Sequence, residues 1–180
     1  MEVPAMRPAF RYLFSAIALS VAAAPAHADQ AMVALGRVPA AATLRPAPDT
    51  VKLQRLLAEA DDASVNGRDA QAKRIYRTLA QEQRSANVYA GTALWRLAAM
   101  QLFTGKTMDA ARTLEETAAE AARFGDPSME LRATFEAAIL WQKVKRHDLA
   151  MTHLERVRCL LQSPVIDDEI KRSIERRIVD

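Results

Sequence analysis

Apolar residues recur at helical spacing along most of the chain, and short polar or glycine-containing turns interrupt them. In the first such segment Leu53, Leu56 and Leu57 share one side of a helix, since residues three and four apart lie on the same helix face. Asn66 and Gly67 end this segment, because glycine tolerates the left-handed conformation that closes a helix. The alternating runs of Val, Ile and Thr that strands require are absent from the sequence. The pattern predicts an all-α protein.

Similar turns divide the later part of the chain into further helices. The predicted helix ends are Gly67, Gly105 and Gly125, with residues 145–147 replacing a glycine turn. The predicted N-caps are Asp49 or Thr50, then Asp69, Thr107 and Asp126 before Pro127, and Ser163-Pro164 is predicted to open the last helix. Short turns make neighbouring helices antiparallel. We therefore expect seven helices, arranged as three hairpins and a closing helix.

Alanines recur at matching positions in the three predicted hairpins. The first helices carry Ala60, Ala98 and Ala138, which are 38 and then 40 residues apart, and the second helices carry Ala72, Ala110 and Ala150. Large residues follow four positions later, at Tyr76, Leu114 and Leu154. Only a small side chain lets two helix backbones approach closely where they cross, so we interpret the alanines as crossing points. An irregular helix bundle is the alternative interpretation.

Two segments resemble the second-helix signature of tetratricopeptide repeats. They are GRDAQAKRIYRTLA at residues 67–80 and GKTMDAARTL at residues 105–114. The similarity covers roughly residues 49–163, and the period is longer than the 34 residues that are typical of the family. The resemblance implies a right-handed stack of about three antiparallel helix hairpins with a C-terminal capping helix.

The same resemblance implies a non-enzymatic protein that binds a protein or peptide on the face lined by the first helices. By position, this lining comprises Leu57, Asp61, Trp95, Ala99, Phe103, Arg132, Phe135, Ile139 and Gln142. Independently of the family, Trp95, Phe135 and Ile139 form an aromatic and aliphatic set of the kind that anchors partners. Alternatively, these three residues lie in the core or are covered by the segment before residue 49. For Phe135 and Ile139 we favour the core.

The N-terminal residues 1–28 are predicted to be a signal peptide. Arg7 and Arg11 lie before an apolar run at residues 12–24. After this run comes an A-x-A pattern that ends at Ala28, which is the pattern that signal peptidases recognise. Cleavage is therefore predicted after Ala28. The alternative is a membrane anchor, but the run is well short of the roughly 20 residues that span a bilayer.

Residues 29–48 are rich in alanine and proline and are predicted to be a tether, followed by the repeat domain at residues 49–180. The predicted location is a bacterial periplasm, with secretion as the alternative. Cys159 is the only cysteine, so an internal disulfide is excluded. We expect this thiol to be buried between the third hairpin and the last helix, with a disulfide between two chains as the alternative.

The charge pattern does not indicate a nucleic-acid binder. The net charge is +3, and acidic and basic residues are mixed along the chain, whereas nucleic-acid binding needs basic residues on one face. A basic side of the third hairpin is the one local exception, formed by Lys143, Lys145, Arg146, Arg156 and Arg158. It could meet anionic lipid or cell-wall polymer, but we favour an ordinary solvated face, so membrane-surface contact is disfavoured.

The sequence offers no catalytic, metal-binding or cofactor-binding motif. His147 and His153 are six residues apart, which places them about 240° apart around a helix, too far to share a metal. Glu115, Glu116 and Glu120 are helical neighbours and are expected to form a solvated face. The favoured function is therefore a binding scaffold. A self-associating module, forming a homo-oligomer, and a helical binder of a small ligand are the alternatives.

Overall fold

Seven α-helices and no strands make up residues 49–179, the part of the chain that the computed structural model describes. The helices are α1 (Thr50–Val65), α2 (Asp69–Ser85), α3 (Gly91–Phe103), α4 (Thr107–Phe124), α5 (Pro127–Lys143), α6 (His147–Leu161) and α7 (Asp168–Val179). The all-α fold and the layout of seven helices are thus confirmed. The predicted signal peptide and tether lie outside the described residues.

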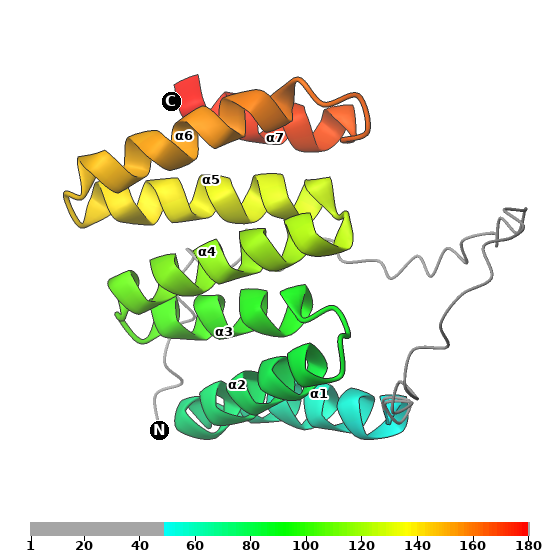
Figure 1. Ribbon diagram of the computed structural model, residues 1–180. Coiled ribbons are helices and arrows are strands. Elements are labelled where there is room, and N and C mark those ends of the chain that lie inside the picture. The colour runs from blue at the N-terminus through cyan, green and yellow to red at the C-terminus, as the bar shows by residue number, and fades with distance from the viewer. Residues whose placement is uncertain (1–48, 180) are drawn as a thin grey trace, which may run out of the picture. The chain divides into compact units, whose positions relative to one another are not determined.

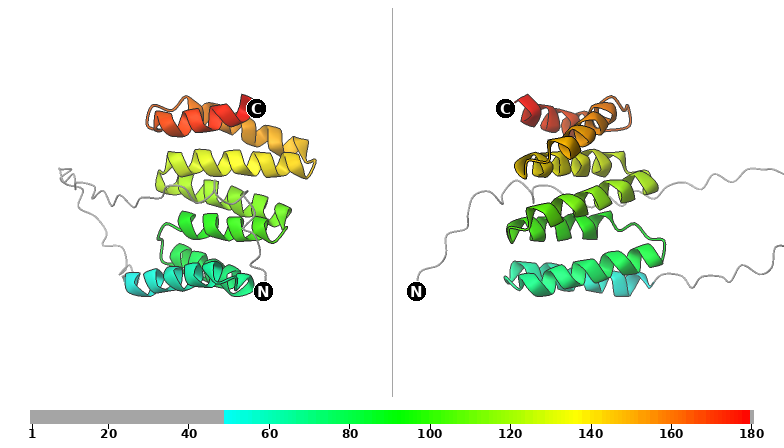
Figure 2. Two further views of the ribbon diagram at one scale, coloured as in Figure 1. Left: turned by 180° about the vertical axis from the view of Figure 1, so that it is seen from behind. Right: turned by 60° about the vertical axis from the view of Figure 1, so that its left-hand side comes forward.

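The helices are packed in chain order, from α1 and α2 at one end to α6 and α7 at the other (Figures 1 and 2). Each helix from α1 to α5 packs against the next one in the chain, and α7 lies against α5. The turns inside the hairpins gather at one edge, on the left in Figure 1, and the turns between hairpins lie at the opposite edge. The predicted antiparallel hairpins are therefore present.

The three hairpin turns share one backbone arrangement. Gly67, Gly105 and Lys145 occupy the same position in them, with φ angles of +69°, +76° and +63°. In each turn the amide of the following residue donates to the carbonyl oxygen five residues earlier, with N–O distances of 2.8, 2.8 and 2.9 Å. These bonds are the closing bonds of a Schellman motif. Lys145 therefore takes a glycine position, although its Cβ makes the left-handed conformation unfavourable.

The two turns between hairpins close in the same way, at the opposite edge. Asn87 and Gly125 have φ angles of +56° and +70°, and the amide after each donates to the carbonyl five residues earlier, at 2.7 and 2.9 Å. Tyr89 links these two turns, because its hydroxyl donates to Oδ2 of Asp126 at 3.1 Å. The ring of Tyr89 also covers Gly91, where an added Cβ would lie 2.2 Å from the ring atom Cζ. A side chain at this position would therefore require the ring of Tyr89 to shift.

The alanines predicted to mark helix crossings are buried, with exposed fractions of 0–3%. Ala60 and Ala72 lie in one apolar cluster, together with Leu97 and Met100. A second cluster joins the later crossings and contains Ala98, Ala110, Ala133, Ala137, Trp141 and Ala150. The interpretation of these alanines as positions of close helix packing is confirmed.

Side-chain caps are present at only some of the predicted positions. Asp49 accepts a hydrogen bond from the amide of Lys52 at 2.9 Å, and Asp126 accepts one from the amide of Met129 at 3.0 Å. The prediction was wrong for Asp69 and Thr107. Both are the first residues of their helices, and the residues before them occupy the N-cap positions without a side-chain cap. In these two turns the residue directly after the left-handed glycine, Arg68 or Lys106, takes the N-cap position. Asp69 and Thr107 therefore lie one position inside their helices.

The last helix begins later than predicted. Ser163 and Pro164 lie in the connecting turn, whereas α7 starts at Asp168, where Oδ1 of Asp167 accepts from the amide of Glu169 at 2.6 Å. The physical reason is Ile166, which is 3% exposed and packs into the core between the two helices. The acidic first turn and basic last turn of α7 complement the helix dipole.

The predicted burial of Cys159 was wrong, since this residue is exposed. Val157 and Leu160 are the neighbouring residues of α6 that face the core, with exposed fractions of 1% and 6%. Cys159 lies between them in sequence and therefore points away from α5 and α7. Within residues 49–179, no helix combines the length and the apolar character needed to cross a membrane.

Candidate functional site

Trp95 and Phe103, two of the residues predicted to bind a partner, lie on one stripe of α3 with Ala99 between them. Trp95 is partly buried and packs against the cluster that contains Ala133 and Trp141. Phe103, at the C-terminal end of the helix, is 61% exposed. This stripe is therefore partly core and partly surface.

The predicted residues of α5 separate into two groups. Arg132 and Gln142 are exposed, whereas Phe135 is 1% exposed and Ile139 is partly buried. The two apolar residues pack against α6 and α7, in a cluster that includes Ile174. Phe135 therefore belongs to the core, which was the favoured interpretation, and it does not share a surface with Arg132.

Helix α7 covers this part of α5 and is held there by one of its arginines. The guanidinium of Arg177 lies over the ring of Phe135, 4.7 Å from its centroid, and bonds Glu136 at 2.5 Å. A cation over an aromatic face is an attractive contact, and here it adds to the ion pair. The predicted face formed by the first helices is thus open at α3 and closed by α7 along the apolar residues of α5.

Asp61, a further residue of the predicted lining, is used to join the first three helices. Its carboxylate accepts a hydrogen bond from the hydroxyl of Tyr76 at 2.5 Å and forms an ion pair with Arg96. Burial, and then this hydrogen bond, raise the pKa of Tyr76 above its ordinary value. Leu57, on the preceding turn of α1, packs against the apolar cluster beneath. These contacts are structural.

A cleft of about 380 Å³ lies between α2 and α4, with α3 at its floor. Its lining comprises Arg77, Ala80, Gln81 and Arg84 of α2, Leu94, Leu97 and Gln101 of α3, and Asp109, Arg112, Thr113 and Glu116 of α4. The floor residues Leu94 and Leu97 are almost completely buried, so the accessible groups are mainly polar. This cleft uses the second helices of two hairpins, not the face predicted from the sequence.

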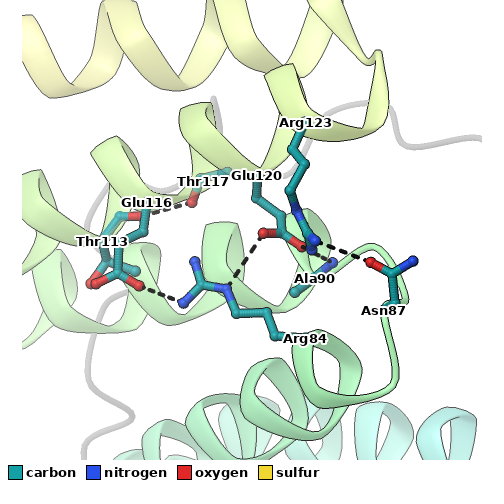
Figure 3. A network of polar contacts seen from close by, with 8 residues as sticks. All are labelled: Arg84, Asn87, Ala90, Thr113, Glu116, Thr117, Glu120 and Arg123. Carbon is teal, nitrogen blue, oxygen red and sulfur yellow. Dashed lines mark hydrogen bonds and ion pairs between the residues drawn. The ribbon is translucent and has the colours of Figure 1, made fainter. Parts of the chain in front are cut away.

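A polar network closes one end of the cleft (Figure 3). Arg84 of α2 reaches toward α4, where it contacts Glu116 at 2.9 Å and Glu120 at 3.5 Å. Glu120 also contacts Arg123 at 3.0 Å and accepts a hydrogen bond from the amide of Ala90 at 3.3 Å. The carboxylate thereby joins α2, α4 and the turn before α3.

The prediction of a solvated face for the glutamates of α4 was therefore wrong for Glu120, whose side chain is only 6% exposed. Glu115 is also partly buried, because Oε1 accepts from Nε1 of Trp141 at 2.7 Å and contacts Nε2 of His153 at 2.7 Å. This carboxylate joins α4, α5 and α6. Both glutamates have partners that account for their positions, so neither indicates acid–base chemistry.

The predicted basic side of the third hairpin is partly neutralised. Arg146 pairs with Asp148 at 2.8 Å, and Arg156 bonds Glu130 at 2.5 Å. The pKa of Asp148 is lowered to about 2, chiefly by its hydrogen bond from Arg146. No group of three or more His, Cys, Asp or Glu side chains suited to a metal ion is found within residues 49–179.

Sequence reasoning missed the cleft, and one signal within α3 points to it. Leu94, Leu97 and Gln101 follow one another at the spacing of a core stripe, so the third position places an amide where an apolar residue is expected. The arginines of α2 and α4 gave no such signal, since exposed basic residues are common on helices. Comparison of the chain with protein families, with curated proteins and with solved structures finds no significant match.

Proposed function

We propose that the protein is a non-enzymatic exported scaffold that binds a protein or peptide partner. In this proposal the hairpins form a divergent, right-handed, tetratricopeptide-like array, and the partner lies on the face of the first helices. The ordered packing of the hairpins, closed by the same turn each time, supports the repeat character. Repeats of this kind bury their apolar surface against one another and present an extended rigid surface to partners.

One observation carries the proposal: Phe103 is 61% exposed at the C-terminal end of α3, on the stripe that it shares with Trp95. Aromatic and arginine side chains that combine exposure with a fixed backbone are typical anchors of protein interfaces. Arg132 and Gln142 add exposed polar groups on the first helix of the next hairpin. Because α7 covers Phe135 and Ile139, the proposed surface centres on α3 and on the polar residues of α5.

Capture of partners from a periplasmic extract by the tagged full chain tests this function. We expect Phe103→Ser and Arg132→Ala to reduce recovery of the partner. Met151→Ser is the matched control, since Met151 is 56% exposed but lies on a second helix. Circular dichroism checks that each variant is folded. Equal recovery by the wild type and by both test variants would show that this surface does not bind the partner.

Self-association is a second candidate function, favoured by the apolar side chains near the hairpin turns. Val65, Phe103 and Met108 are 86%, 61% and 55% exposed, and they flank the turns at Gly67 and Gly105. A second copy of the chain could cover them. Light scattering across micromolar concentrations distinguishes the two candidates, because a strict monomer excludes self-association.

A further inference from the structure

We propose that the cleft between α2 and α4 is a docking site for an extended peptide segment that carries an acidic side chain. This inference rests on the proposed binding function but assigns it a second surface, formed by second helices. Three features of the cleft carry it: a buried amide oxygen without a partner, arginines on both walls, and a floor with little accessible apolar surface.

The side chain of Gln101 is the first feature. The residue is 5% exposed, yet no donor within residues 49–179 reaches its Oε1, and that atom has almost no surface open to solvent. Buried polar groups without partners are rare and costly, so one that lines a cleft calls for an explanation. Gln101 also lines the cleft, so the cleft is where a donor for this oxygen can arrive. A ligand with an N–H group would then satisfy it.

The charges of the walls are the second feature. Arg84 and Glu116 neutralise each other across the closed end of the cleft (Figure 3). Arg77 on α2 and Arg112 on α4 have no ion-pair partner within the described part of the chain, and Asp109 is the carboxylate that remains. The open end of the cleft is therefore net positive. A guanidinium from either wall can form charge-assisted hydrogen bonds to a carboxylate.

The floor decides between kinds of ligand. Ala80, Leu94 and Leu97 are only 3–4% exposed, so an apolar ligand would gain little contact there. An inorganic anion without a proton, such as sulfate, would satisfy the arginines but brings no donor for Gln101. An extended peptide brings both groups, since its backbone offers an N–H at each residue and its side chain supplies the carboxylate. The cleft volume of about 380 Å³ is at the lower end of the range for ligand sites, which suits a few residues.

Selection of peptides from a displayed library tests the proposal. The probe is a library of random linear peptides, panned on the full-length wild-type chain, and each recovered peptide is then measured by fluorescence polarisation. We expect enrichment of Asp and Glu in the recovered peptides. Arg77→Glu and Arg112→Glu should each weaken binding by about tenfold or more, the effect of losing one charge-assisted contact. Arg158→Glu, an equal change of charge on α6, should leave binding unchanged.

Gln101→Leu separates recognition from general electrostatics. It keeps the size of the side chain and removes the unpartnered amide oxygen, so we expect weaker peptide binding together with a higher melting temperature. A purely structural Gln101 would give no change in binding. Circular dichroism and thermal melting of every variant exclude loss of binding through unfolding.

The possible outcomes are distinct. Acidic peptides that lose binding on substitution of Arg77, Arg112 and Gln101 support the proposal. Recovered peptides that bind all of these variants equally overturn the cleft as their site and leave the scaffold function standing. Recovery of no peptide above the blank overturns the proposal and leaves the scaffold function standing, since capture of a partner from the extract tests that function separately. A wild-type dimer that Arg112→Glu dissociates would make a second copy of the chain the occupant, and would also overturn the proposal.

Discussion

Glu120 offers a sharp test of what holds α2, α3 and α4 together. Its carboxylate contacts Arg84 and Arg123 and accepts from the buried amide of Ala90, while its own side chain is 6% exposed. Substitution by alanine removes the acceptor from that amide and leaves a small space. Substitution by glutamine keeps the shape and the acceptor but removes the charge. The two variants therefore separate the hydrogen bond from the ion pairs.

The size of each effect follows from the burial of the partners. A buried amide that loses its acceptor costs about 1–3 kcal/mol. The arginines are 37% and 47% exposed, so they regain water and each ion pair contributes at most about 1 kcal/mol. We expect Glu120→Ala to lower the free energy of unfolding by about 2–3 kcal/mol and Glu120→Gln by about 1 kcal/mol. Glu116→Ala is the matched control, because its pair with Arg84 is exposed, and it should cost less than about 1 kcal/mol.

Urea unfolding followed by far-ultraviolet circular dichroism measures these differences. The slope of the free energy against urea should remain that of the wild type, so the effect appears as a shift of the midpoint. The reasoning is refuted if Glu120→Ala is as stable as Glu116→Ala. It is also refuted if the glutamine variant loses as much as the alanine variant, since the charge would then outweigh the bond to the amide.

Four further predictions concern separate parts of the chain. Lys145→Gly should raise the free energy of unfolding by roughly 0.5–1 kcal/mol, because it removes a Cβ from a left-handed turn. The urea midpoint should rise accordingly, and an unchanged or lower midpoint contradicts this. Gly91→Ala should lower the free energy of unfolding by about 1–3 kcal/mol, because the new Cβ meets the ring of Tyr89. The melting temperature should fall accordingly, and wild-type melting would show that the ring moves aside freely. Tyr76 and Tyr89 should resist ionisation in the folded chain, since burial raises the pKa of each. Folded-state stability should therefore fall as pH rises above the ordinary tyrosine pKa near 10. In a chain that begins at Asp29, and so lacks Tyr12, absorbance at about 295 nm should rise only with unfolding. Intact mass of the chain after expression in a Gram-negative host should correspond to cleavage after Ala28, whereas retention of residues 1–28 contradicts the predicted signal peptide.

The features predicted correctly from the sequence are those set by local chemistry. Gly67, Gly105 and Gly125 mark helix ends because few other residues adopt a left-handed backbone, and the pair Asp126 and Pro127 marks a helix start for equally local reasons. The recurring alanines were found because close packing leaves few residue types possible. Each of these signals acts within one or two turns of helix, so it can be read without knowledge of the fold.

The features that were missed depend on which helices meet. Glu120 is buried because the turn before α3 lies against α4, and its sequence neighbours show nothing of that contact. Cys159 is exposed because α7 packs on the side of α6 that carries Val157 and Leu160. The cleft requires side chains from three helices, of which Gln101 alone carried a signal. Phe103 and Phe135 are both aromatic residues of first helices, but Phe135 is buried under α6 and α7, whereas Phe103 at the end of α3 is exposed.

The packing of consecutive helices has a consequence for how the chain folds. Apart from the contact of α7 with α5, the main helix pairs join neighbours in the sequence, so each pair can form after closing only a short loop. Chains dominated by such local pairs fold quickly, since little entropy is lost before the first contacts are made. Formation can start in any hairpin and spread to its neighbours, as expected where helices contact mainly their neighbours in the sequence. Loss of one turn should then loosen the adjacent hairpins before the distant ones.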